Sequence, residues 1–324
     1  MEEPTQVEQA ATGTTVARGG RPSAASHHGW REDLMALTKA RLSMLVLVTV
    51  AAGFLMASDG SIAWWGLLHT IIGTGLVAAA CAVFNQIMET DVDARMQRTA
   101  DRPLPAGRMQ PAAAFVVGWL LAAIGIVHLA SMVNTEAAMI TALTLAVYVF
   151  VYTPLKRRST ANTLVGAVSG ALPPVAGWAA AAGPVTEDFT GLFRWELLWQ
   201  PGAVFLFLLL FFWQLPHFLA INWLYRDQYR EAGFVMWSNH DDSGRLTGRL
   251  ATAFTLPLLP LMWLPALQGQ SALLTAVGGT VAGAALLRLA LVFSRRPDRG
   301  GARRLFFGTL LYLPVVLLLA VIDW

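Results

Sequence analysis

Long runs of apolar residues recur along this chain of 324 residues and set the strongest limit on its fold. A helix of about twenty uncharged residues spans the hydrocarbon core of a bilayer and hydrogen-bonds its own backbone there. The first and fourth runs are short for a crossing. We expect nine membrane-crossing helices, at residues 43–58, 62–84, 112–132, 136–153, 162–182, 201–224, 250–268, 271–293 and 305–322.

The composition agrees with this interpretation. Hydrophobic residues make up 56% of the chain and charged residues only 13%, whereas soluble domains carry about 25% charged residues. The chain is therefore predicted to be an all-α polytopic membrane protein. The single cysteine, Cys81, lies within an apolar run, forms no internal disulfide and is expected to be an inert thiol.

The first residues differ from the rest of the chain. Residues 1–30 contain no apolar core, which predicts a disordered tail and not a signal peptide. Residues 31–324 are then expected to form one transmembrane domain.

The basic residues predict the orientation. With nine crossings and a cytoplasmic N-terminus, every Lys and Arg except Arg194 falls on the cytoplasmic side, as the positive-inside rule requires. The C-terminal Trp324 then lies on the outer face of a bacterial-type inner membrane. Because topology accounts for the basic residues, the net charge of +3 does not indicate nucleic-acid binding.

A group of acidic and amide side chains follows the second apolar run. If the helix continues past Phe84, then Asn85, Glu89 and Asp93 stand at i, i+4 and i+8 and spread over only about 80° of its surface. Asp91 points elsewhere. Two carboxylates so placed at a membrane boundary repel each other unless a cation intervenes. The spacing therefore predicts a cation site.

Mg²⁺ is the expected cation, since it takes one or two carboxylates and completes its coordination with water and phosphate. Arg98, Arg102 and Lys156 lie on the same side and offer donors to phosphate oxygens. The alternative is a solvated loop whose acids and bases form surface ion pairs.

A second polar cluster ends the sixth run. Pro216 is expected to kink that helix, and Pro173 with Pro174 to break or kink the fifth, beside a cavity. Alternatively, His217 is simply hydrogen-bonded inside the bundle, and Tyr225 and Tyr229 are interfacial belt residues. The cluster consists of His217, Asn222, Tyr225, Arg226, Asp227, Tyr229 and Glu231.

The motif NQIMETDVDARMQRTADRPL at residues 85–104 resembles the first polar motif of the UbiA superfamily of intramembrane prenyltransferases. Gln86 and Glu89 replace two aspartates of the usual motif, and this pattern is similar to the protohaem IX farnesyltransferase branch. The segments WQLPHF, YRDQY, YTPLKR and GALPP also resemble that branch. The likeness covers residues 31–322.

The resemblance implies a nine-helix bundle with a polar mouth facing the cytoplasm and a lipid-lined tunnel. It implies Mg²⁺, farnesyl diphosphate as donor and haem B as acceptor, alkylated at a vinyl group with addition of water. The product, haem O, would serve terminal oxidases, with a downstream haem-modifying enzyme as a further partner.

The resemblance also implies roles for individual residues. Asn85, Glu89 and Asp93 would be catalytic and hold Mg²⁺, and Asp227 would be the principal acid of a second site. That site has fewer acids than usual, which puts a second metal ion in doubt. The predicted diphosphate-binding residues are Arg98, Arg102, Lys156 and Arg226. Separately from the resemblance, His217 is a candidate for contact with the haem, as iron ligand or propionate partner, and Tyr225 and Tyr229 are further candidate haem contacts.

Three other functions are compatible with parts of this pattern. An aromatic acid or quinone precursor as acceptor would use the same metal site. A transporter would be expected to place its carboxylates near the bilayer midplane, often on broken helices. A non-catalytic haem-binding subunit would favour paired histidines, for which His69 and His128 are the candidates.

Overall fold

The computed structural model describes residues 29–58, 60–184, 193–270 and 272–324. Residues 1–28 of the predicted tail lie outside the described residues, and Trp30 begins the first helix. The regular secondary structure of the described residues is entirely helical. The helices are α1 (Trp30–Thr38), α2 (Ala40–Ala57), α3 (Trp64–Asp93), α4 (Pro111–Met132), α5 (Thr135–Ala146), the π-helical η1 (Val147–Tyr152), α6 (Thr153–Leu155), α7 (Asn162–Ala181), α8 (Glu196–Trp199), α9 (Pro201–Leu224), α10 (Arg226–Ala232), the 3-10 helix η2 (Trp237–His240), α11 (Arg245–Thr255), α12 (Leu258–Leu261), α13 (Leu264–Leu267), α14 (Leu273–Arg295) and α15 (Arg299–Asp323).

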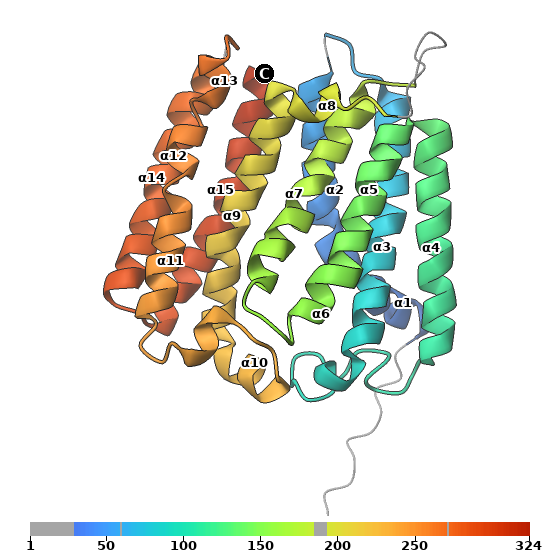
Figure 1. Ribbon diagram of the computed structural model, residues 1–324, viewed down its shortest axis with the longest axis vertical. Coiled ribbons are helices and arrows are strands. Elements are labelled where there is room, and N and C mark those ends of the chain that lie inside the picture. The colour runs from blue at the N-terminus through green and yellow to red at the C-terminus, as the bar shows by residue number, and fades with distance from the viewer. Residues whose placement is uncertain (1–28, 59, 185–192, 271) are drawn as a thin grey trace, which may run out of the picture.

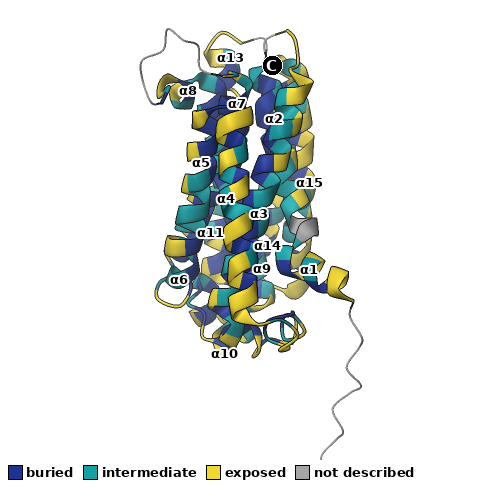
Figure 2. Ribbon diagram, turned by 90° about the vertical axis from the view of Figure 1, so that its right-hand side faces the viewer, coloured by how far each residue is buried: buried dark blue, intermediate teal, exposed yellow. Residues whose placement is uncertain are grey.

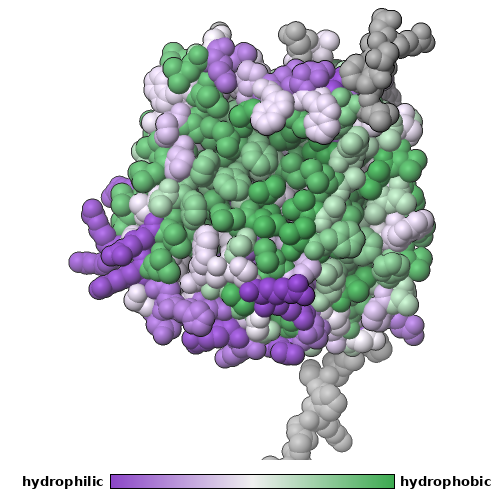
Figure 3. Space-filling view, viewed as in Figure 1, coloured by the Kyte–Doolittle hydropathy of each residue, from purple (hydrophilic) through white to green (hydrophobic). Residues whose placement is uncertain are grey.

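The long helices stand side by side in one bundle (Figure 1). Within the described residues, eight segments are long and apolar enough to cross a membrane, and α1 with α2 form a ninth, bent by 51°, if taken as one span. On the face seen in Figure 3, apolar residues cover the middle of the bundle and hydrophilic residues gather towards its two ends. The predicted all-helical membrane fold is confirmed.

The fourth span is longer than its apolar run suggested. Helices α5, η1 and α6 follow one another without a gap and give a segment of 21 residues, Thr135–Leu155. Its inner part is π-helical over Val147–Tyr152. π-helical turns are rare and are frequent at functional sites, and this one brings two tyrosines to the site described below.

The fifth span, α7, is continuous from Asn162 to Ala181, so Pro173 and Pro174 do not break it. Helix α2 packs directly against α7 at this level. A Cβ atom added at Gly53 would lie 2.0 Å from the Pro174 carbonyl oxygen, and one added at Gly177 would lie 2.0 Å from the Val50 oxygen. Small residues allow such close backbone approach between membrane helices, and this contact supports the proline-containing helix. Pro216 also lies inside an unbroken helix, α9.

Exposed residues lie mainly on the outward-facing sides of the helices, and buried residues on the sides that face other helices (Figure 2). At the end that carries α8, the buried Glu136 carboxylate accepts hydrogen bonds from Arg194 Nε at 2.8 Å and Nη2 at 2.9 Å. The carboxylate of Glu136 raises the pKa of Arg194 above its usual value. This ion pair accounts for the single basic residue that the sequence places on the outer side.

We predict that Gly177→Ala lowers the free energy of unfolding in detergent by about 1–3 kcal/mol, the usual effect of overpacking. The added methyl group meets the backbone of α2, which cannot move aside as a flexible side chain can. Thermal unfolding of the purified protein measures the change. Gly66→Ala is the matched control, because its Cβ would lie 3.4 Å from Phe54, an ordinary contact. Equal stability of both variants would contradict the α2–α7 packing.

Candidate active site

Helix α3 continues for 30 residues and ends at Asp93, well beyond its apolar part. Asn85, Glu89 and Asp93 therefore share one helical face, as their spacing predicts. Their exposed fractions are only 1%, 5% and 1%, and all three line a cavity of about 230 Å³. The end of α3 thus places three oxygen-bearing side chains in one cavity, which other charged residues and several apolar residues also line. We call it the polar cavity for its charged side chains.

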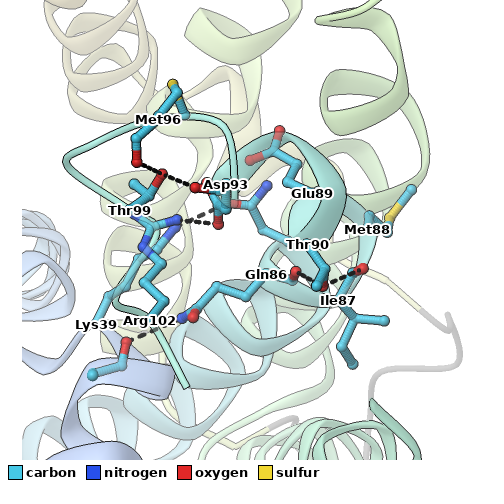
Figure 4. Close-up of polar contacts among 12 residues, drawn as sticks. Lys39, Gln86, Ile87, Met88, Glu89, Thr90, Asp93, Met96, Thr99 and Arg102 are labelled. Atoms are coloured by element: carbon cyan, nitrogen blue, oxygen red, sulfur yellow. Dashed lines mark hydrogen bonds and ion pairs between the residues drawn. The ribbon is translucent and has the colours of Figure 1, made fainter. Parts of the chain in front are cut away.

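Each of these three side chains contacts a different basic side chain. Lys39 Nζ donates to Asn85 Oδ1 at 2.9 Å, and Lys156 Nζ lies 2.8 Å from Glu89 Oε1. Figure 4 shows Arg102 directed at the Asp93 carboxylate, with Nη1 2.5 Å from Oδ2. All three cations line the same cavity. The cavity therefore contains two acids whose charges are already matched by bases.

Lys39 is placed there by the way α1 ends. It has a left-handed backbone, with φ 48°, the single non-glycine residue of positive φ among those described. The Gln86 side-chain amide of α3 donates to the carbonyl oxygens of Ala36 and Leu37, at 3.0 and 2.6 Å. These carbonyls belong to the last turn of α1 and have no helical partner. Gln86 therefore holds α1 against α3.

Two pKa values follow from this arrangement. Burial lowers the pKa of Lys39 to about 7, with a further contribution from the positive charges of Arg102 and Lys156. Burial alone would also lower the pKa of Lys156. The Glu89 carboxylate outweighs burial and raises the pKa of Lys156 above its usual value.

The other predicted residues divide into two groups. Arg98 and Tyr229 line the cavity, and burial raises the pKa of Tyr229 above its usual value. Tyr225 is 37% exposed, and its ring lies 5.8 Å from the Arg98 guanidinium carbon. Tyr225 thus contacts a cavity residue from outside.

Arg226 and Asp227 do not line the cavity. Asp227 lies on the exposed side of α10, with Oδ1 3.0 Å from Arg230 and 3.7 Å from Arg226. The Arg226 guanidinium lies 4.8 Å from the Trp223 ring centroid. A role of Asp227 at the cavity would require these ion pairs to exchange.

Asp91 lies on another face of α3, as its phase predicts. It is exposed and pairs with Arg157, whose Nη2 lies 2.5 Å from Oδ1. Surface ion pairing therefore describes this residue well. It does not describe Glu89 and Asp93, which are buried one turn or less away.

A second, mainly apolar cavity of about 360 Å³ adjoins the first. Lys39, Tyr148, Tyr152 and Phe218 line both cavities. Pro173 also lines the second one, as expected for a cavity beside the prolines, and so does His217. The site therefore consists of a polar cavity joined to an apolar cavity.

Three of these residues were not singled out from the sequence. Lys39 counted only as a basic residue beside the first span, because its contact with Asn85 depends on the bend after α1. Tyr148 and Tyr152 stand four and eight residues before Lys156, a spacing that was visible in the sequence. The Lys156 ammonium lies 4.6 Å from the Tyr152 ring centroid.

The two candidate haem-binding histidines of the middle spans lie next to each other. His69 Nδ1 and His128 Nε2 are 3.2 Å apart, and the ring centroids are separated by 5.1 Å. Hydrogen bonding between the rings gives each histidine a partner inside the bundle. Neither residue lines the two cavities described above.

We predict that Glu89→Gln destabilises the ligand-free protein by about 3–5 kcal/mol, because it leaves the buried Lys156 charge without its counter-ion. Asp91→Asn is the matched control on the same helix and should cost about 0–1 kcal/mol, since its pair with Arg157 is exposed. Thermal unfolding compares the two variants. Similar losses in both would contradict the buried pairing.

Comparison with known proteins places this geometry in a family. Residues 46–311 match the UbiA prenyltransferase family. A protein of Solibacter usitatus named protoheme IX farnesyltransferase is 38% identical over 300 residues, which cover 90% of this chain and 98% of the relative. A relative of the same name from Opitutus terrae is 40% identical over 295 residues, covering 90% and 94% of the two chains.

Solved structures share the fold at much lower sequence identity. A digeranylgeranylglyceryl phosphate synthase superposes with a TM-score of 0.73 at 15% identity, covering 90% of this chain and 98% of that one. A UbiA homologue from Archaeoglobus fulgidus, bound to DMAPP and Mg²⁺, gives a TM-score of 0.65 at 13% identity, covering 89% and 99%. This chain is therefore an integral membrane protein that belongs to the UbiA prenyltransferase family.

Proposed function

We propose that this protein transfers the farnesyl group of farnesyl diphosphate to a vinyl group of haem B, with addition of water, to give haem O and diphosphate. The observation that carries the proposal is the pairing of a cavity rich in matched charges with an adjoining apolar cavity. An isoprenyl diphosphate likewise consists of a charged diphosphate and an apolar chain. The names of the relatives over nearly the whole chain support farnesyl transfer to haem.

Mg²⁺ fits the residues of the polar cavity. Asn85, Glu89 and Asp93 offer one amide oxygen and two carboxylates from a single helical face. The described residues contain no group of three or more His, Cys, Asp or Glu that would hold a metal by themselves. Two carboxylates suit Mg²⁺ that shares its coordination with water and substrate phosphate. Bound there by these three residues, Mg²⁺ would neutralise charge on the diphosphate.

The basic residues of the cavity would bind the diphosphate oxygens. Lys39, Lys156 and Arg102 each contact one of the three oxygen-bearing side chains. When those side chains hold the metal, the cations are free to donate to phosphate, together with Arg98. They stabilise the negative charge that develops as the C1–O bond of the donor breaks and its electron pair leaves with the diphosphate.

The carbon chemistry belongs to the apolar side of the site. The allylic cation must meet the acceptor before water does, which requires a closed, apolar surrounding. The terminal vinyl carbon of haem forms the new bond to C1. The inner carbon is left as a cation conjugated with the macrocycle, where water adds and releases a proton. Holding the two reacting carbon atoms close together and correctly oriented contributes several orders of magnitude to the rate.

The positions of the basic residues support one orientation in the membrane. The loops after α3, α6 and α14, which carry basic residues, lie at the end of the bundle that contains α10 (Figure 1). Under the positive-inside rule this end faces the cytoplasm. The polar cavity would then receive its diphosphate substrate from that side of a bacterial-type inner membrane.

We predict that membranes containing the protein convert haem B, with farnesyl diphosphate and Mg²⁺, to a product heavier by a farnesyl and a hydroxyl group. Asp93→Ala should lower the rate by about a hundredfold or more, because it removes a ligand that stabilises the transition state. Omitting Mg²⁺ should abolish the product. Mass spectrometry detects the haem.

Asp91→Asn serves as the control, since Asp91 faces away from the cavity. Farnesylation of an aromatic acceptor, with no haem product, would keep the prenyltransferase reaction and contradict the haem assignment. Equal haem product from wild type and Asp93→Ala would contradict the proposed role of the α3 carboxylates.

A further inference from the structure

His217 has its two ring nitrogens in different surroundings. Nδ1 lies 2.8 Å from Thr309 Oγ1, and the Thr309 hydroxyl donates to the Phe306 carbonyl oxygen at 2.6 Å. A hydroxyl has one proton and a carbonyl can only accept, so Thr309 cannot donate to the imidazole as well. Nδ1 must therefore carry the proton and donate it to Thr309. Neutral His217 then has an unprotonated Nε2.

The ring is also held in a defined plane. Trp213 lies near-parallel to it at 20°, with centroids 5.4 Å apart, and Phe306 at 27° and 5.0 Å. Trp213 Nε1 donates to the Thr309 carbonyl oxygen at 2.6 Å, so the same threonine anchors both rings. These contacts fix the plane of the imidazole ring, and the Nε2 lone pair lies in that plane.

No described residue gives Nε2 of His217 a hydrogen-bond partner, and His217 lines the apolar cavity. Nε2 is therefore available to a ligand that enters the cavity. A neutral imidazole whose other nitrogen donates a hydrogen bond is the usual protein ligand for a transition metal. Isoprenoid carbon placed beside His217 would offer Nε2 no partner, whereas the iron of a porphyrin seated at this part of the cavity would bind it.

We propose that Nε2 of His217 is the axial ligand of the haem iron while haem B is bound as the acceptor. This inference rests on the proposed function and names the residue that seats the acceptor. Phe218, the next residue, lines both cavities, so a macrocycle held at His217 lies beside the polar cavity. Thr309 is the positioning residue, since it fixes the tautomer of the ligand.

The test uses the purified full-length protein with haem B and without farnesyl diphosphate. Resonance Raman spectroscopy of the ferrous complex should show an iron–histidine stretching band. His217→Gly should lose that band, and added imidazole should restore an iron–imidazole band by filling the space left by the side chain. Thr309→Val should shift the band and weaken haem binding about 10- to 100-fold, as loss of a ligand's hydrogen-bond partner does.

His128→Ala is the matched control, because His128 is a half-buried membrane histidine that lines neither cavity. It should keep the band unchanged. A wild-type haem complex that lacks the band, or that keeps it in His217→Gly without imidazole, would overturn the assignment. Loss of the band in His128→Ala, with retention in His217→Gly, would assign the ligand to the His69–His128 pair instead.

These outcomes separate the two proposals. If haem is farnesylated but the band does not depend on His217, then the inference about the ligand fails and the proposed function stands. If wild type neither binds nor modifies haem, both fail. Unchanged elution and unfolding temperature of the variants show that they are folded.

Discussion

The structure of the site depends on one constraint, which is that buried carboxylates at the end of a membrane helix need cations. Glu89 and Asp93 are buried on one face of α3, and each lies within 3 Å of a base. Lys39 donates instead to the neutral amide oxygen of Asn85. The three basic residues come from separate parts of the chain, so these contacts also bring α1, the loop after α3 and the segment after α6 together.

Under the proposed function, a metal ion on the acids and phosphate on the bases would replace the internal ion pairs. The adjoining cavity, in contrast, is lined mainly by apolar residues. Tyr148, Tyr152 and Phe218 form the boundary between the two, and the π-helical turn of the fourth span supplies both tyrosines.

Local regularity explains what the sequence could predict. Apolar runs located the membrane helices, and the helical period placed Asn85, Glu89 and Asp93 on one face and Asp91 on another. The role of Lys39 was out of reach, because it depends on a left-handed turn that Gln86 stabilises from another helix. Spacing also could not show that Asp227 points outward, since the direction of α10 is set by the packing of the loops. Pro173 and Pro174 indicated a break or a kink beside a cavity; the helix α7 is unbroken, and Pro173 does line a cavity.

The most direct test of the account measures whether metal and diphosphate bind as one unit at α3. Thermal unfolding of the purified protein is followed with the unreactive farnesyl thiodiphosphate, with Mg²⁺, and with both. The account predicts a large increase in unfolding temperature only when both are present, and none in Asp93→Asn, since a ligand stabilises only the state that binds it. Equal stabilisation without Mg²⁺, or in Asp93→Asn, would contradict a metal–diphosphate site on this helix.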